Sequence, residues 1–326
     1  MGGTGGSVAG SGMGCPGSGS PGSGTGGVGT GFGVGCDMGL GYPVATVRTL
    51  HPRSDRYSPP VLTVAGLNTF PVKGCAPVPL TRARVGAAGL EHDRAWMVTD
   101  PDGTFRSQRR DPRLALVHPR VADDVLVLSA PDAPVIEVEV DDHAPARPVT
   151  LFGEPFRGID QGDPAADWLT RVLGRPSRLV RVPPDHDRAP TGLTPGTSGY
   201  ADSSAVHLLG LASHAELNRR LATPVPLDRF RANVLVAGGL PHAEDDLRAI
   251  TVGGVALGYT KPAIRCAVTT VDQATAARTG PEPLRTLATY RRTPEGVAFG
   301  VKFAVTTPGW IEVGDEVTGA GPPSAR

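Results

Sequence analysis

Cys266 is the residue of this sequence whose side chain offers the most chemistry. It follows Arg265 and opens an apolar run over 267–271 that is typical of a β-strand. A neighbouring cation favours the thiolate, which is the form that attacks electrophiles and binds soft metals. A free cysteine also often packs as a small apolar residue, and the segment by itself leaves both interpretations open.

Several other segments combine cations, small hydroxyls and glycine. A lysine beside a glycine suits anion binding, because glycine lets backbone N–H groups approach and lysine adds charge. Small hydroxyls before an apolar run either cap a helix or bind a phosphate. Each segment also has an ordinary interpretation as a solvated turn or a surface ion pair. The candidate residues are Lys73 and Gly74 in 70–75, Arg94 in 89–96, Asp202, Ser203 and Ser204 in 198–204, Arg231 and Asn233 in 228–234, and Lys302 in 298–303.

Together, these residues indicate a large anionic cofactor that brings its own metal. The segments supply one thiol, several cations and several hydroxyls, but no cluster of His, Asp and Glu. Zinc, calcium and magnesium sites built from protein ligands need more of those residues. The sequence also lacks a GxGxxG before an expected helix, a P-loop and a GxSxG elbow. Dinucleotide, nucleotide-phosphate and α/β-hydrolase sites are therefore not expected.

The composition argues against other classes of protein. Basic and acidic residues number 32 each among 326 residues, so no global basic field attracts nucleic acid or an anionic membrane. No stretch approaches the roughly 20 consecutive apolar residues of a membrane helix. The four cysteines include no CxxC pair. Their scarcity argues against a disulfide scaffold or a cysteine-bound cluster and favours a reducing, cytoplasmic setting.

Lysine is rare among the basic residues. Only Lys73, Lys261 and Lys302 are lysines, and all the others are arginines. The two side chains differ in geometry and in how readily their pKa shifts. The three lysines either survive by chance or mark places where a compact ammonium group is needed.

The pattern of the chain predicts a mainly β, α+β protein with two β-rich units behind a long tail. Residues 1–60 are rich in Gly, Ser and Pro and are expected to be disordered. Helices are expected over 163–173, with Asp163 as N-cap, and within 208–221, with Ser213 as N-cap. The loop over 183–199 is long enough to cover a site. Strands are expected over 61–67, 95–99, 113–117, 125–128, 135–140, 179–182, 233–237, 249–257, 266–271, 297–305 and 310–316.

The order of these motifs resembles the MOSC family over about 61–317. Residues 70–75, 89–98 and 107–116 resemble its N-terminal domain. Residues 230–233, 243–245, 261–272, 282–287, 299–300 and 311–315 resemble the MOSC domain itself. The resemblance implies an N-terminal β-barrel-like domain over 61–180, followed by a MOSC β-barrel domain with a few helices over 181–320. It is strongest to the mitochondrial amidoxime-reducing components and their bacterial homologues.

The resemblance also implies a site. In the family, the matching cysteine is a thiolate ligand of molybdenum, so Cys266 would bind the metal of a molybdenum cofactor. Gly74 replaces the family's usual Ser, and Ala263-Ile264 replaces a more polar pair. Ala232 replaces a common Pro, and Val301-Lys302 replaces a polar pair, so pterin contacts and substrate range are affected more than the metal ligand. The residues implied around the pterin and its phosphate are Lys73, Gly74, Arg94, Asp202, Ser203, Ser204, Arg231, Asn233, Ile264, Arg265 and Lys302.

The activity implied is that of a molybdenum-dependent oxidoreductase that reduces small N-hydroxylated compounds. Some bacterial relatives carry a C-terminal ferredoxin domain. This chain ends soon after Val317 without one. Electrons would therefore come from a separate ferredoxin- or cytochrome b5-like protein and its reductase. No nucleic acid or membrane partner is expected.

A second implied function is the handling of cofactor or sulfur without reductase activity. MOSC domains also occur fused to cofactor sulfurases, where they bind or pass on the sulfurated cofactor. Such domains often carry a pyridoxal phosphate label that derives from the fused lyase. Lys73 and Lys261 are the residues that could form a Schiff base with that group.

Overall fold

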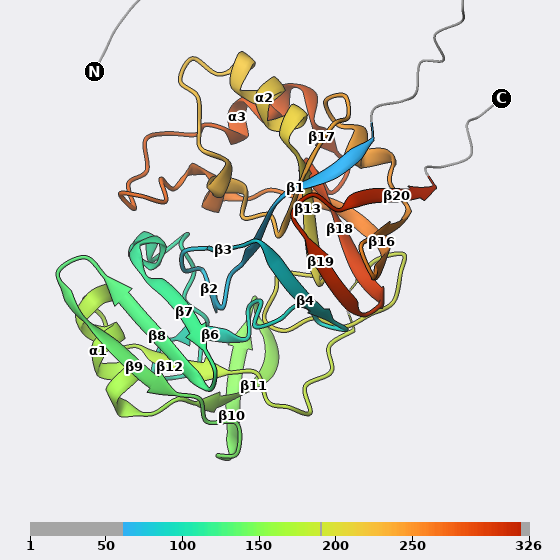
Figure 1. Ribbon diagram of the computed structural model, residues 1–326. Helices are drawn as coiled ribbons and strands as arrows, with labels where there is room; N and C mark the ends of the chain where they lie inside the picture. Colours follow the sequence, from blue (N-terminus) through green and yellow to red (C-terminus); the bar gives the residue numbers. More distant parts are fainter. Residues whose placement is uncertain (1–60, 190, 321–326) are drawn as a thin grey trace, which may run out of the picture. The chain divides into compact units, whose positions relative to one another are not determined.

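The computed structural model describes residues 61–189 and 191–320 (Figure 1). They fall within one compact unit, Tyr57–Arg326. The expected tail over 1–60 lies outside the described residues. Within the described part, strands dominate and three α-helices occur, so the predicted mainly β fold class is confirmed. None of the described helices is both long and apolar enough to cross a membrane.

Seven strands close into a barrel in the order β13-β14-β1-β20-β15-β16-β18, with β18 pairing back to β13. Among these seven barrel strands, only β13 and β14 run parallel to each other. Two short strands extend the sheet: β3 (Val78–Leu80) pairs with β1, and β17 (Arg292–Thr293) pairs with β18. The barrel strands are β1 (Leu62–Thr69), β13 (Val206–Gly210), β14 (Val234–Ala237), β15 (Ala249–Val252), β16 (Val255–Ile264), β18 (Gly296–Thr307) and β20 (Glu316–Ala320).

Three further sheets come mainly from the first half of the chain. Strand β1 precedes these sheets in the chain but lies in the barrel. The first half of the described chain therefore contributes to the barrel as well as to these three sheets. The five-stranded sheet holds β10 (Ala146–Leu151), β11 (Glu154–Asp160), β12 (Arg178–Arg181), β6 (Trp96–Thr99) and β2 (Val72–Lys73). One three-stranded sheet holds β7 (His118–Ala122), β8 (Val125–Ala130) and β9 (Ala133–Glu139). The other holds β19 (Gly309–Glu312), β4 (Arg82–Gly86) and β5 (Gly89–Leu90).

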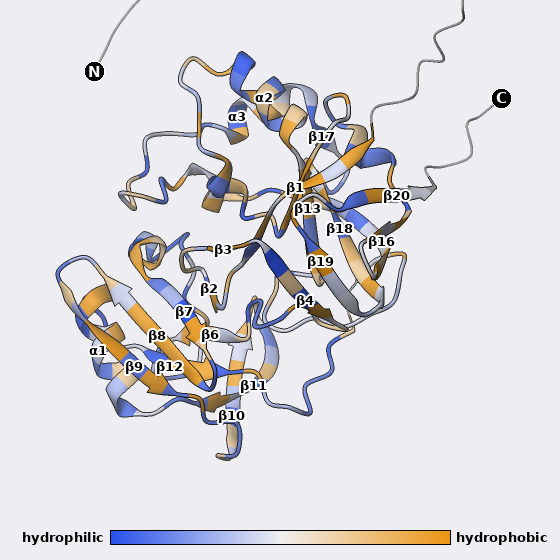
Figure 2. Ribbon diagram, in the orientation of Figure 1, coloured by the Kyte–Doolittle hydropathy of each residue, from blue (hydrophilic) through white to orange (hydrophobic). Residues whose placement is uncertain are grey.

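The helices cover apolar faces of these sheets. Helix α1 (Asp163–Leu173) contacts β9 and β12, and buries Trp168, Leu169 and Val172 in a shared core. Figure 2 shows hydrophobic residues along β8 and β9 near this helix. Helix α2 (Leu211–Arg220) contacts β13 and β14, and α3 (Leu284–Tyr290) contacts β18. The short 3₁₀ helices are η1 (Pro112–Leu116), η2 (Leu227–Phe230), η3 (Ala243–Asp246) and η4 (Ala267–Thr270).

Two predicted strands, 113–117 and 266–271, form 3₁₀ helices instead, and the predicted strands over 249–257 and 310–316 are each divided by a turn into two strands. The segment 113–117 is largely the 3₁₀ helix η1, which starts with a proline and whose first turn closes by Leu114 N–H donating to the Asp111 carbonyl. The segment 266–271 forms η4, because Thr269 and Thr270 hydroxyls donate to carbonyls three residues back. Such local bonds compete with a sheet ladder, and a short apolar run has no period that separates strand from helix. Cys266 therefore lies where the chain leaves the barrel.

The two predicted helix caps also differ. Helix α1 has the predicted bounds, but Gly162 is its N-cap and Asp163 is already helical. Helix α2 begins at Leu211 behind the N-cap Gly210, since β13 occupies the preceding residues. The hydroxyl of Ser213 instead donates to the buried carboxylate of Glu244 at 2.7 Å. Helix α3 was not expected from the sequence.

A glycine in β18 is required by close packing. Gly300 has φ +80, and a Cβ there would lie 2.6 Å from His207 Nε2 and 2.7 Å from the Leu208 carbonyl oxygen. Gly300→Ala is expected to lower the free energy of unfolding by about 3 kcal/mol, from left-handed backbone strain plus overpacking. Gly314, with φ +100 and open space, is the control: Gly314→Ala should cost only about 1 kcal/mol. Urea denaturation would measure both, and equal losses would contradict the packing explanation.

Candidate functional site

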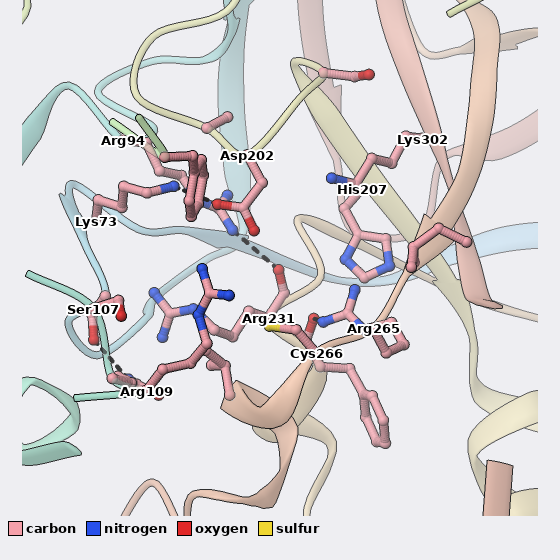
Figure 3. Close-up of a pocket in the computed structure, with 18 of the residues that line it drawn as sticks. Lys73, Arg94, Ser107, Arg109, Asp202, His207, Arg231, Arg265, Cys266 and Lys302 are labelled. Atoms are coloured by element: carbon pink, nitrogen blue, oxygen red, sulfur yellow. Dashed lines mark hydrogen bonds and ion pairs between the residues drawn. The ribbon is translucent and has the colours of Figure 1, made fainter. Parts of the chain in front are cut away.

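A cavity of about 850 Å³, counted out to its open mouth, lies where the barrel meets the five-stranded sheet. Lys73 ends β2, Lys302 lies on β18, and Cys266 follows the end of β16. Figure 3 shows cationic side chains from these separate elements around Cys266. The basic residues that line the cavity are Lys73, Arg94, Arg109, Arg231, Arg265 and Lys302, against the single carboxylate of Asp202.

Asp202 and the adjacent Ser203 each hold one of the cations at the cavity wall. The carboxylate of Asp202 pairs directly with the Lys73 ammonium group, and Lys302 Nζ donates to the hydroxyl of Ser203 at 2.8 Å. Desolvation opposes ionisation of Asp202, but the charges of Lys73 and Lys302 outweigh it and hold the pKa of Asp202 well below its usual range. The side chain is still 59% exposed, because it faces the hollow of the cavity.

Arg94 is held by a buried polar network. The carboxylate of Asp93 accepts bonds from Arg94 Nη1 at 2.6 Å, from the backbone N–H of Phe70 at 2.9 Å and from Asn233 Nδ2 at 2.9 Å. Asn233 Oδ1 in turn accepts from Arg94 Nη1 and from the backbone N–H of His207, each at 3.1 Å. The side chain of Asn233 therefore fixes both Arg94 and the barrel strand β13, which contains His207.

Two arginines present donors that the protein leaves unpaired. Arg231 Nη2 and Arg265 Nε are buried and have no hydrogen-bond partner among the described residues. Desolvation, followed by the nearby charge of Arg94, lowers the pKa of Arg231 to about 10. The guanidinium groups of Arg94 and Arg231 lie 4.2 and 4.4 Å from the centroid of the Phe70 ring. Buried Nε atoms of Arg106, Arg181 and Arg229 also lack partners, but Arg231 and Arg265 line the cavity, so their free donors face the space that a ligand would occupy.

Cys266 is half-buried and is the N-cap residue of η4. Its neighbour Arg265 is fixed from both ends: its backbone N–H donates to Val297 O at 2.8 Å, and Nη2 donates to Phe230 O at 2.8 Å. The part of the chain that the structure describes contains no group of three or more His, Cys, Asp or Glu side chains able to hold a metal ion. The arrangement suits one soft metal bond through sulfur, with further metal ligands coming from a bound anionic group.

The structure brings together the site residues that the sequence and the resemblance indicated. Every one of these candidate residues lines the cavity except Ser203, whose hydroxyl accepts a hydrogen bond from the lining residue Lys302. Of the three lysines, Lys73 and Lys302 line the cavity, whereas Lys261 donates to the Thr191 hydroxyl. No described residue of the loop 183–199 lines it. Arg188 of that loop instead donates to the backbone carbonyls of Ala201 and Asp202.

Sequence reasoning missed several lining residues, above all His207, Phe105 and Phe152. Desolvation, with the charges of Arg265 and Lys302, holds the pKa of His207 well below its usual range, so the ring is neutral. The signal available was its position as the one polar side chain in a fully buried strand. For Phe152 the signal was a bulky aromatic residue directly before a turn glycine.

Comparison with known proteins agrees with this architecture. Residues 61–176 match the MOSC N-terminal beta barrel domain, and residues 195–318 match the MOSC domain. The chain belongs to the MOSC family. Mitochondrial amidoxime-reducing component 1 of Homo sapiens is 32% identical over 84% of this chain and 88% of its own. The Mus musculus protein of the same name is 34% identical over 83% and 86%.

A protein with a different name also matches this chain over part of its own length. Molybdenum cofactor sulfurase of Danio rerio is 31% identical over 74% of this chain, which corresponds to 32% of its own length. Among solved structures, the YUAD protein from Bacillus subtilis covers 79% of this chain at 12% identity and a TM-score of 0.35, which is too distant to inform the site. The predicted boundary between the two MOSC segments, at 180–181, stays a prediction.

The Asp93 network should be essential for stability. Asp93 has a side chain only 1% exposed, so Asp93→Ala would leave Arg94 without its buried counter-charge. We expect a loss of about 3 kcal/mol in the free energy of unfolding, measured by urea denaturation. The matched control is Glu91→Ala, because Glu91 forms only an exposed pair with Arg84 at 3.6 Å. That variant should lose less than about 0.5 kcal/mol, and similar losses in both would refute the role of the network.

Lys302 should reduce stability in the absence of a ligand. Desolvation lowers its pKa to about 8, and the charges of Arg265 and Lys73 oppose its protonation while Asp202 favours it. Lys302→Met removes the buried charge and should raise the free energy of unfolding of cofactor-free protein by about 1 kcal/mol at pH 7. Between pH 8 and 10.5 the unfolded lysine binds more protons than the folded one, so wild-type stability rises and the difference shrinks.

The control for this change is Lys261→Met, since Lys261 pairs with Lys302 across the sheet but does not line the cavity. It should change stability by less than about 0.5 kcal/mol at either pH. Urea denaturation at pH 7 and pH 10 would measure the three proteins. A Lys302→Met protein that is less stable than wild type at pH 7 would contradict the electrostatic account.

Proposed function

We propose that this protein binds the molybdenum cofactor and reduces small N-hydroxylated compounds. The observation that carries the proposal is the cavity itself, in which six basic side chains and one carboxylate surround a single accessible thiol. The relationship to amidoxime-reducing components supports the same reaction. When bound, the cofactor supplies the two-electron chemistry that removes oxygen from an N–OH group.

The donor set fits that cofactor. A pterin phosphate is an anion, and the unpaired donors of Arg231 and Arg265 are the kind of group that it would satisfy. Lys73, Lys302, Arg94 and Arg109 add positive charge from the other walls. Gly74, Asp202, Ser203, Ser204, Asn233 and Ile264 complete the proposed cofactor contacts. The thiol of Cys266 would be the protein's ligand to molybdenum, since soft metals prefer sulfur.

The chain's own residues orient and shield the reacting centre. The Asp93–Asn233 network fixes the guanidinium of Arg94 before any ligand binds. Apolar rings of Phe105, Phe152 and Phe230 line parts of the same cavity and limit the entry of water. A cation such as Arg94, which is held in place before the ligand binds, lowers the reorganisation of the protein that is needed when charge moves during reduction. Electrons would come from a separate ferredoxin- or cytochrome b5-like protein with its reductase, in a reducing, cytoplasmic setting.

A second candidate is a cofactor or sulfur carrier without reductase activity. The match to molybdenum cofactor sulfurase supports it, although that protein is matched over only 32% of its length. In this function Cys266 would carry sulfur as a persulfide. Neither Lys73, which is paired with Asp202, nor Lys261, which is outside the cavity, supports a pyridoxal site.

The deciding experiment is a metal analysis of the full chain produced in a host that makes the cofactor. Wild-type protein should contain stoichiometric molybdenum by mass spectrometry and reduce benzamidoxime when supplied with an electron donor. Cys266→Ser removes the soft ligand and should lose most of the metal and the activity. Cys75→Ala is the matched control, because Cys75 is the other described free thiol, is fully buried and does not itself line the cavity.

Molybdenum that is absent from the wild type, or unchanged in Cys266→Ser, would refute the proposal. A persulfide on Cys266, seen by mass spectrometry in protein that does not reduce benzamidoxime, would favour the carrier function instead.

A further inference from the structure

The tip of the β10–β11 hairpin carries an unusual residue for its backbone. Phe152 and Gly153 form a two-residue turn between Leu151 and Glu154, with φ +56 and +88. Two positive φ values define a turn that strongly favours Asn-Gly. A bulky side chain at such a φ is strained, and strain of this kind is often kept at binding sites. Folding alone would favour a smaller, polar residue at 152.

The Phe152 ring is also left half exposed. Its exposed fraction is 47%, and it packs edge-to-face against Phe105 with ring centroids 5.6 Å apart at 77°. The backbone N–H of Phe105 donates to Thr150 O at 2.9 Å, which ties Phe105 to the end of the same hairpin. Both rings line the cavity around Cys266. We call these two residues the aromatic lip.

The aromatic lip borders the cationic interior. Lys73 Nζ lies 5.1 Å from both ring centroids, and the Arg109 guanidinium carbon lies 5.4 Å from that of Phe152. Lys73 is buried whereas Phe152 is not. The cavity wall therefore changes from buried cations to an exposed apolar ring. That order suits a ligand with a polar end directed inward and a flat apolar body at the lip.

We propose that the aromatic lip binds the conjugated ring of aromatic N-hydroxylated substrates and makes the enzyme prefer them over aliphatic ones. This inference rests on the proposed function for the identity of the substrate. Aromatic rings gain affinity from offset or edge-to-face packing beyond the area that they bury. We assign the ring bound at the lip to the substrate and not to the cofactor, because the exposed lip is apolar. An anionic cofactor is matched instead by the buried unpaired donors of Arg231 and Arg265.

The test compares benzamidoxime with acetamidoxime, which share the N–OH group and differ in the ring. Dissociation constants are measured by calorimetry on oxidised full-length protein without an electron donor, so that no turnover occurs. Phe152→Ala should weaken benzamidoxime binding by roughly three- to tenfold and change acetamidoxime binding less than twofold. Phe152→Trp should stay close to wild type. Under turnover, the KM for benzamidoxime should rise by a similar factor in Phe152→Ala.

Two further variants separate binding from folding. Phe152→Asn places the favoured turn residue at the hairpin tip, so its melting temperature should equal or exceed that of wild type while benzamidoxime binding falls as in Phe152→Ala. Trp310→Ala is the matched control, because Trp310 is 48% exposed and borders Arg82 but does not line this cavity. It should leave both dissociation constants unchanged.

The proposal is overturned if Phe152→Ala affects both ligands equally or neither, or if it lowers the molybdenum content. A Phe152→Asn protein with a lower melting temperature would also overturn it, by assigning the ring a structural role. Ring-selective binding that depends on Phe152 supports the proposal even in protein that does not reduce benzamidoxime. That result would separate a failure of the proposed reaction from a failure of the aromatic lip.

Discussion

The buried carboxylate of Asp93 is the interaction on which the site depends. It accepts hydrogen bonds from its neighbour Arg94, from Phe70 and from Asn233, which lies 140 positions further along the chain. Because all three donors meet one desolvated anion, their relative positions are fixed before any ligand arrives. The guanidinium of Arg94 is held at the cavity wall, and Asn233 joins the same network to the barrel strand β13 through the backbone of His207. The wall of the cavity is therefore part of the folded core rather than a flexible surface.

The electrostatics of the cavity favour a ligand over the empty protein. Burial lowers the pKa of Lys73, of Arg231 to about 10 and of Lys302 to about 8, which means that the fold holds these charges at some cost. Asp202 offsets part of it through its pair with Lys73. An anionic cofactor would offset more, since it brings negative charge to several desolvated cations at once. Positive charge that weakens the ligand-free protein would thereby contribute to the binding energy of such a ligand, as is usual where function and stability compete.

Two kinds of surface meet in this cavity, and each suits a different part of a ligand. The deep wall carries donors and a thiol that suit a metal-bearing anion, whereas the aromatic lip faces outward. Residues 61–176 provide Lys73, Arg94 and both lip phenylalanines, and residues 195–318 provide Cys266, Arg231, Arg265 and Lys302. Neither matched segment contains the whole lining, so the cavity exists only in the folded combination of the two. The β1 strand, which pairs with β14 and β20, fastens the first segment to the barrel of the second.

The sequence by itself determined the mainly β class, helix α1 with its bounds, and the residues most able to do chemistry, because strand alternation, proline and glycine positions and family motifs are local signals. It did not determine η1 and η4, since short apolar runs such as 113–117 and 266–271 carry no period that separates strand from 3₁₀ helix. Only the tertiary structure decided that Lys302 and Lys73 face one hollow while Lys261 does not, and that His207 and Phe152 belong to it. The physical reason is that the cavity depends on contacts between residues far apart in the chain, such as Lys73 with Asp202 and Arg94 with Asn233, which are 129 and 139 positions apart. Such contacts arise when the barrel closes, and no local pattern of side chains records which of them will meet.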